Sequence, residues 1–399
     1  MLRRGQPLES ALKSATADLD NPADRGLAHA LAATVLRWLP DIDALIDSAT
    51  RQPLPDDAKA RMALRIALAQ SLRLGTPGHA AIATVLPLVD GGPRKLVHGV
   101  FGTLDRKKAQ LPAQPGLPLP VQLRWQTQWG DAMCDAAGVA LAEPPPLDLT
   151  LKNPGETADW AERLGGVSLM SGHVRLPFGA RIEELPGFAE GAWWVQDLSA
   201  SLPARLLNAQ PGDTALDLCA APGGKTMQLA SAGASVTAVE ANPNRLARLR
   251  ENLERTGLAA DLLRADILNW QPNGQFDHVL LDAPCSATGI FRRHPDVLYR
   301  VRPSDIAQLA ATQAAMLARA AQWVKPGGTL IYCVCSLEPE EGEGQLGALE
   351  SAGLRVEAVA ANTLPGGILP DATGCIRTLP GMVDGGLDGF FIARLRRTE

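Results

Sequence analysis

The sequence lacks any apolar stretch long enough to cross a membrane, and it lacks the charge excess that keeps a chain disordered. Charged residues make up 20% and apolar residues 46% of its 399 positions, which is the composition of a globular protein. After Arg3 and Arg4, no apolar segment of signal-peptide length precedes Asp18. We therefore expect a cytoplasmic protein of two or three domains that has no membrane partner.

Cysteine is scarce. The six cysteines are too few in a chain of this length to form a disulfide framework, and the cytoplasm would keep them reduced. No zinc-site spacing occurs, since the Cys-x-Cys pair of Cys333 and Cys335 has no histidine nearby. We therefore predict that no metal is bound.

Positive charge is not in excess either. The formal net charge is −5, whereas binding along the phosphates of a nucleic acid depends on many lysines and arginines. The composition therefore excludes a protein that coats nucleic acid indiscriminately. Any contact with RNA must come from local patches.

The first part of the chain has a helical pattern. Apolar residues recur at helical spacing from about residue 8 to 108, which predicts an all-helical domain over residues 1–111. A proline-rich run then excludes helix and suits a semi-rigid linker at residues 112–122. Its prolines are Pro112, Pro115, Pro118 and Pro120. Residues 123–190 combine a helical stretch with the alternating segment LDLTL and are predicted to form a small mixed α/β region.

Strands and helices alternate from residue 191 to 399. TALDL, VTAVE, DLLRAD, HVLLDAPC and TLIYCVCS have strand patterns, and helical segments lie between most of them. This order is typical of an α/β fold with a doubly wound parallel sheet. The final segment DGFFIARL is predicted to be a strand at the edge of that sheet.

The segment DLCAAPGGKT follows the first of these strands and opens a helix, where open α/β sheets bind their ligands. Gly223 and Gly224 let the backbone come close to a ligand. The spacing is not that of a dinucleotide-binding loop, and Pro222 removes an amide that a pyrophosphate would need. The loop is therefore predicted to hold a nucleoside without phosphates.

Three acidic residues, Glu240, Asp266 and Asp282, end successive predicted strands. Glu240 is placed to accept hydrogen bonds from ribose hydroxyls, and Asp266 to face an adenine amine. Together the carboxylates suit S-adenosyl-L-methionine, which carries a sulfonium and an ammonium group, better than an anionic dinucleotide. The alternative is that Glu240 and Asp266 cap helices.

Two cysteines, Cys285 in DAPCSATG and Cys335 in YCVCSLEPEE, stand at the ends of neighbouring strands and are expected to open onto one crevice. A thiolate that adds to carbon 6 of cytosine makes carbon 5 nucleophilic, so that it can accept a methyl group. Asp282 could donate to ring N3 if protonated, or accept from the exocyclic amine. The alternative is that both cysteines are small buried apolar residues. The residues alone do not decide which thiol attacks.

CAAPGGKT, DAPCSATGIFRRHPD and CSLEPEE occur in this order and together resemble the bacterial Sun/Fmu family of ribosomal RNA cytosine-C5 methyltransferases. The helical first domain resembles the NusB-like RNA-binding domain of that family. The resemblance implies a class I, Rossmann-like methyltransferase sheet, small-subunit (16S) ribosomal RNA as substrate, Cys335 as nucleophile and Cys285 as an aid to product release. It departs at Val334, where the family has threonine, and at Glu240, where it usually has aspartate.

The same resemblance implies which residues hold S-adenosyl-L-methionine. They are Cys219, Ala220, Ala221, Pro222, Gly223, Gly224, Lys225, Glu240, Asp266 and Asp282. A basic run directly after the Cys285 loop is a candidate for RNA phosphate contacts, although a solvated charged helix explains it equally well. Its members are Arg292, Arg293, His294 and Arg300.

Three other functions compete with a ribosomal RNA methyltransferase. A transfer RNA cytosine-C5 methyltransferase has the same chemistry. A DNA or protein amino-methyltransferase is disfavoured, because such enzymes commonly present N/D-P-P-Y/F where this chain has DAPC; we expect no DNA partner. A non-catalytic RNA-binding assembly factor would be supported by a degenerate cofactor loop or by lost cysteines, and neither occurs.

Overall fold

The computed structural model describes residues 2, 5–351 and 353–398. The chain forms two compact units. The helical unit comprises Met1–Pro144 and Phe291–Val301, and the sheet unit comprises Pro145–Ile290 and Arg302–Glu399. Among the described residues, no helix combines the length and apolar composition needed to span a membrane.

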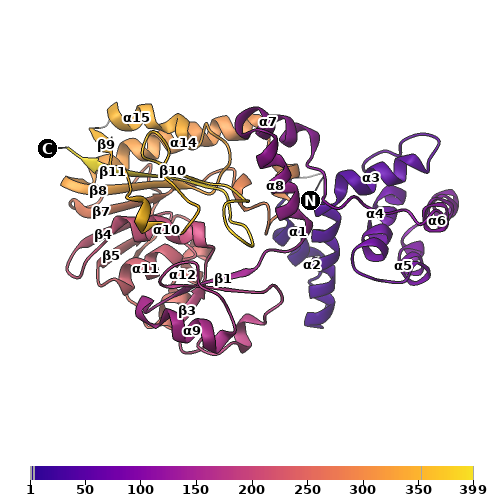
Figure 1. The fold of residues 1–399 in the computed structure, drawn as a ribbon, viewed down its shortest axis with the longest axis horizontal. Coiled ribbons are helices and arrows are strands. Elements are labelled where there is room, and N and C mark those ends of the chain that lie inside the picture. Colours follow the sequence, from indigo (N-terminus) through magenta and orange to yellow (C-terminus); the bar gives the residue numbers. More distant parts are fainter. Residues whose placement is uncertain (1, 3–4, 352, 399) are drawn as a thin grey trace. The chain divides into compact units, whose positions relative to one another are not determined.

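The helical unit confirms the all-helical pattern of the first hundred residues (Figure 1). Leu64 and Leu68 of its fourth helix are buried, and they pack in one core with Ile42, Val97 and Phe101 from two other helices. The helices are α1 (Leu8–Ala15), α2 (Pro22–Arg37), α3 (Leu39–Ser48), α4 (Lys59–Leu72), α5 (Gly78–Val85), α6 (Gly91–Arg106), α7 (Leu119–Trp129), α8 (Asp131–Ala142) and α13 (Val297–Arg300).

The proline-rich run packs within the helical unit. The Gly116 amide donates to Asp41 Oδ2 at 2.9 Å, and Leu117 is buried. Because these contacts hold the run against α3, the chain divides after α8, at Pro144, rather than within the predicted linker at residues 112–122.

Residues 291–301 belong to the helical unit although they follow the strand that carries Asp282. Phe291 is buried, with its ring centroid 5.4 Å from that of Trp125. The Tyr299 hydroxyl donates to the Leu36 carbonyl at 2.7 Å. The segment is thus part of the core of this unit.

The sheet unit contains the predicted α/β fold, an eight-stranded sheet in the order β10-β11-β8-β7-β4-β5-β6, with β9 paired to β11. Strands β4 to β8 are parallel. The strands are β4 (Thr214–Leu218), β5 (Ser235–Val239), β6 (Asp261–Leu263), β7 (Phe276–Asp282), β8 (Val324–Val334), β9 (Leu354–Val356), β10 (Ile376–Thr378) and β11 (Phe390–Arg397).

Helices cover both faces of this sheet (Figure 1). Successive side chains of a strand point to opposite faces of the sheet, so both faces are apolar here. Val279 and Leu281 join the core under α14, and Leu280 joins the core under α10. The helices are α10 (Leu198–Leu207), α11 (Gly224–Ser231), α12 (Pro243–Thr256), α14 (Pro303–Gln322) and α15 (Leu346–Ser351).

The prediction that the last strand lies at the sheet edge was wrong. Strand β11 pairs with β8 on one side and with β10 and β9 on the other, antiparallel in each case. Strands β9 and β10 have only three residues each, which is too short to give a periodic pattern in the sequence.

A three-stranded antiparallel sheet precedes the large one, in the order β2-β1-β3, and confirms that LDLTL is a strand. Its elements are β1 (Leu147–Leu151), α9 (Thr157–Leu164), β2 (His173–Leu176) and β3 (Trp193–Val195). Arg175 binds Asp148 through two hydrogen bonds, Nε to Oδ1 at 2.7 Å and Nη2 to Oδ2 at 2.8 Å. The Leu198 amide at the start of α10 donates to the same carboxylate at 3.1 Å. Asp148 thus joins this sheet to the helix that covers the large one.

Replacing Asp148 with asparagine should destabilise the protein by about 3–5 kcal/mol, because Arg175 is left as a buried charge without its partner. Burial raises the pKa of Asp148, but hydrogen bonds and charge from Arg175 and His173 outweigh it and hold that pKa well below its usual range. The ion pair therefore stabilises the fold above about pH 4 and loses its effect as the pH falls further. Denaturant unfolding measured between pH 3 and 7 should show a shallower loss of stability with acid for the variant. Equal slopes for both proteins would contradict this.

Candidate active site

The loop between β4 and α11 has the backbone that its glycines predict. Cys219 has φ 61° and Gly223 has φ 106°, and the Ala221–Pro222 peptide is cis. A Cβ on Gly223 would lie 2.3 Å from Leu249 Cδ1 on α12. Both the left-handed backbone and the close approach of α12 therefore require glycine at this position.

Helix α12 also holds the loop by hydrogen bonds. Arg245 Nη2 donates to the Ala221 carbonyl at 2.5 Å, and Asn252 Nδ2 donates to the Pro222 carbonyl at 2.9 Å. Ala220 and Ala221 are buried, and a Cβ on Gly224 would lie 3.1 Å from the Gln196 side chain. The loop is a rigid cradle at the carboxyl end of β4.

Lys225 and Asp282 form an ion pair at this end of the sheet, with 2.8 Å between Nζ and Oδ2. Burial alone would lower the pKa of Lys225, but the charge and hydrogen bond of Asp282, together with the charges of Cys333 and Asp217, outweigh it and raise that pKa. Asp217, at the end of β4, is fully buried and accepts a hydrogen bond from Thr226 Oγ1 at 2.5 Å, while its Oδ1 has no hydrogen-bond partner. Burial raises the pKa of Asp217 to about 7.

Glu240 and Asp266 differ in how much of their hydrogen-bonding capacity is used. Glu240 is buried; its Oε1 accepts from the Asn242 amide at 2.9 Å, whereas Oε2 has no hydrogen-bond partner and lies 3.6 Å from Arg245 Nη1. Asp266 is exposed, and both of its oxygens accept hydrogen bonds from the turn that follows it. Neither acid caps a helix, because a turn follows Asp266 and the N-cap of α12 is Asn242.

These features fit a cationic nucleoside such as S-adenosylmethionine. The buried Oε2 of Glu240 is an acceptor that a ribose hydroxyl would satisfy. The carboxyl groups of Glu240 and Asp282 stand at the same end of the sheet as this loop and can attract a cationic ligand. In the described part of the chain, no three His, Cys, Asp or Glu side chains are grouped as a metal ion would require.

The structure brings the two candidate cysteines together. Cys285 follows β7, Cys335 follows β8, and their Sγ atoms are 3.5 Å apart. The hydrogen bond with Cys335 and burial raise the pKa of the Cys285 thiol well above its usual value. Cys333, which the sequence interprets as a buried apolar residue, is fully buried, and its Sγ lies 3.5 Å from Asp282 Oδ1.

A buried carboxylate that the sequence interpretation missed connects the two cysteine loops. Glu341 is fully buried, and its Oε2 accepts from Ser286 Oγ and from Ser336 Oγ, each at 2.5 Å. Its Oε1 accepts from the Ser286 amide at 2.8 Å and from Gln313 Nε2 at 3.1 Å. Ser286 directly follows Cys285, and Ser336 directly follows Cys335.

Backbone contacts also connect these loops. The Gly289 amide donates to the Cys335 carbonyl at 3.1 Å, and the Leu337 amide donates to Thr288 Oγ1 at 3.0 Å. A Cβ on Gly289 would lie 1.9 Å from the Gly389 carbonyl oxygen. The only sequence signal for this arrangement was that a serine follows each cysteine, and no spacing rule connects those serines to Glu341.

The basic run after Cys285 is only partly exposed. Arg292 is only 1% exposed, and its carbonyl accepts a hydrogen bond from Arg37 Nη2 at 2.5 Å. Arg300 pairs with Asp296 at 3.1 Å, and Arg293 and His294 are half-buried. Apolar residues interleaved in the run anchor it in the helical unit, so the predicted role of Arg292 disagrees with its burial.

Each of the two units matches a known protein family. The family model for 16S rRNA methyltransferase RsmB/F matches residues 204–396, and the NusB family model matches residues 1–101. The chain is 34% identical over 425 residues to ribosomal RNA small subunit methyltransferase B of Cronobacter sakazakii, with 99% of this chain and 95% of that protein covered.

Two solved structures have similar folds. The crystal structure of PH0851 has a TM-score of 0.76 at 23% identity, covering 99% of this chain and 96% of that one. A methyltransferase homolog protein from Pyrococcus horikoshii has a TM-score of 0.60 at 26% identity, covering 71% of this chain and 96% of that one. The first likeness shows that the fold extends through both units.

Proposed function

Because the chain belongs to the 16S rRNA methyltransferase RsmB/F family, we propose that it methylates carbon 5 of a cytosine in small-subunit ribosomal RNA, in the cytoplasm. Membership makes it an S-adenosylmethionine-dependent methyltransferase of ribosomal RNA. The observation that carries the cytosine-C5 part is the pair of thiols 3.5 Å apart at the ends of β7 and β8. Methylation of an exocyclic amine or a ribose hydroxyl has no use for a thiol nucleophile.

S-adenosylmethionine, when bound, supplies the methyl group as an electrophile. The residues that would hold it are the Cys219–Gly224 cradle, Lys225, Glu240, Asp266 and Asp282. Glu240 is best suited to the ribose, since one of its oxygens is buried without a donor. Asp266 already accepts two hydrogen bonds, but a carboxylate has capacity for more, so it can still accept from the adenine amine.

Cys335 is the proposed nucleophile. Its thiolate adds to carbon 6 of cytosine, and the electron pair of the 5,6 double bond moves so that carbon 5 attacks the methyl group. A base then removes the proton from carbon 5, the double bond re-forms, and the bond between Sγ and carbon 6 breaks. The family resemblance assigns the attack to Cys335 and a part in product release to Cys285, whose pKa is raised by the hydrogen bond with Cys335 and by burial.

Asp282 orients the cytosine during these steps. Its ion pair with Lys225 favours an aspartate that accepts hydrogen bonds over one that donates them. Of the two roles that the sequence leaves open, acceptance from the exocyclic amine of cytosine is therefore the better supported.

Incubation with labelled methyl donor and RNA from cells that lack the protein tests the proposal. We expect 5-methylcytosine at a defined position of 16S ribosomal RNA and no label in transfer RNA. Label in transfer RNA would favour the alternative substrate, and a methyl group on any other atom would refute the cysteine mechanism. RNA binding without methyl transfer would indicate an assembly factor.

A further inference from the structure

Helix α6 of the helical unit has one apolar and one basic side. Val97, Val100, Phe101 and Leu104 are buried in the core of the unit. Residues four positions apart lie on the same side of a helix. The side of α6 that faces away from its buried residues is basic. Its exposed members are Arg94, Lys95, His98 and Arg106 on the helix and Lys107 and Lys108 directly after it. We call this set the α6 basic face.

The cations of this face are not neutralised. Among the described residues, none of its lysines and arginines forms an ion pair. Residues 94–108 contain five lysines and arginines and a single acidic residue, Asp105, in a chain whose net charge is −5. By contrast, Arg61 and Arg65 of α4 are buried and paired with Asp43 at 3.1 and 2.6 Å. Positive charge at α6 is therefore free to bind an external anion.

Gly99 lies on this face, and the packing around it does not require a glycine. A Cβ on Gly99 would meet no atom within 4 Å, so alanine would fit there, and glycine weakens a helix relative to alanine. Gly102, one turn on, is also without a side chain between His98 and Arg106. The helix backbone is thus uncovered at Gly99, whereas the Arg106 guanidinium lies near Gly102, 3.3 Å from where a Cβ would be.

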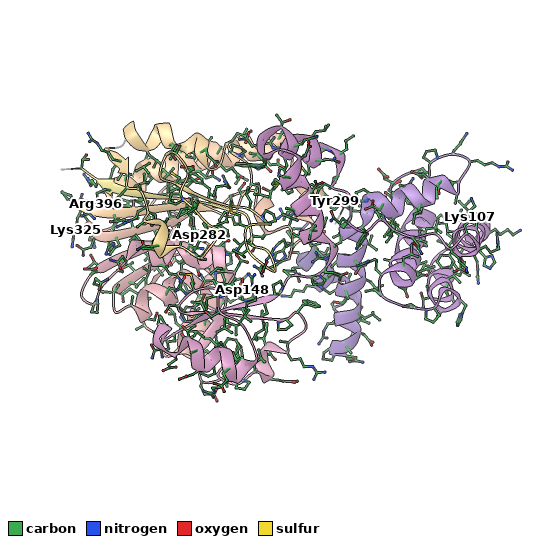
Figure 2. All side chains as sticks on the ribbon, in the orientation of Figure 1. Lys107, Asp148, Asp282, Tyr299, Lys325 and Arg396 are labelled. Carbon is green, nitrogen blue, oxygen red and sulfur yellow. The ribbon has the colours of Figure 1, made fainter. Side chains whose placement is uncertain are left out.

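We propose that the α6 basic face binds the phosphate backbone of the RNA substrate. This rests on the proposed function for RNA as the substrate. From residue 94 to residue 106 the face extends along about 18 Å of helix, enough for several successive phosphates. Figure 1 shows α6 at one end of the helical unit, away from α7 and α8, and Figure 2 shows Lys107 at that end. The exposed members of the face are cations and a histidine, not the apolar residues that form the centre of a protein interface, which favours RNA over an acidic protein.

Such contacts position RNA without reading its sequence. They would act in addition to any contacts of residues 292–300, where Arg292 is buried and Arg300 is paired with Asp296. The proposal thus gives named residues to the RNA binding that the resemblance implies for the helical domain as a whole.

The test measures RNA affinity against salt concentration for Arg94→Gln/Lys95→Gln and for Lys107→Gln/Lys108→Gln. Each pair should lower the slope of log affinity against log salt by about 2 and weaken binding at least about tenfold. Arg51→Gln/Lys59→Gln is the matched control, because it removes two exposed, unpaired cations of the same unit. The KM for RNA should rise in both α6 variants, while kcat and the KM for the methyl donor stay unchanged.

The outcomes separate this proposal from the proposed function. An unchanged slope, or an equal fall in the control, overturns the role of α6 even if the wild-type protein methylates RNA. A fall specific to α6 supports it even if no methyl group is transferred, in which case only the proposed function fails. Because the substituted side chains are exposed, thermal unfolding should be unchanged, and a loss of fold in any of the three variants would show as a lower kcat.

Discussion

Cys335→Ala should form no covalent adduct with RNA and should methylate it at less than about a thousandth of the wild-type rate, because no other group supplies the attack on carbon 6. Cys285→Ala should instead form the adduct and release it slowly. The Sγ atoms lie 3.5 Å apart, so Cys285 adjoins the bond that must break.

Denaturing electrophoresis of labelled RNA measures the adduct directly. Cys134→Ala serves as the control, because Cys134 is a free cysteine of α8 in the helical unit, and it should behave as wild type. If Cys335→Ala stayed active while Cys285→Ala lost activity without an adduct, the two roles would be reversed.

The sequence predicted those parts of the site that local chemistry determines. The cradle follows from glycines and a proline between a strand and a helix, and its left-handed backbone at Gly223 is a property of that residue. The approach of Cys285 and Cys335 follows from topology, since both come after adjacent parallel strands. Neither inference needs knowledge of distant contacts.

The inaccurate predictions depended on partners remote in sequence. Three-residue strands flank β11, and a segment that follows the Cys285 loop packs its apolar residues beside Trp125 of the helical unit. Arg292 is buried with that segment, which its charge alone would not suggest. Burial of this kind depends on tertiary packing, which the spacing of residues along the chain does not determine.

Glu341→Gln should lower kcat about 100-fold, because small displacements of reacting groups have effects of this size. The carboxylate accepts from both serine hydroxyls, Ser286 and Ser336, that directly follow the two cysteines. A glutamine amide offers one oxygen, and its NH₂ group would face a hydroxyl or amide that also needs an acceptor. One loop therefore loses its anchor, and the distance between Cys285 and Cys335 is no longer fixed.

Binding of the methyl donor at residues 219–225 distinguishes this effect from general unfolding. None of the hydrogen bonds to Glu341 comes from residues 219–225, so the KM for the methyl donor should stay within about twofold of wild type in the folded variant. Ser286→Ala, which removes one of the hydroxyls, should show a smaller fall in kcat than Glu341→Gln. A merely structural glutamate would leave kcat per folded molecule unchanged and reduce only the melting temperature. An unchanged kcat would thus show that the buried carboxylate holds the loops without setting the geometry of the thiols.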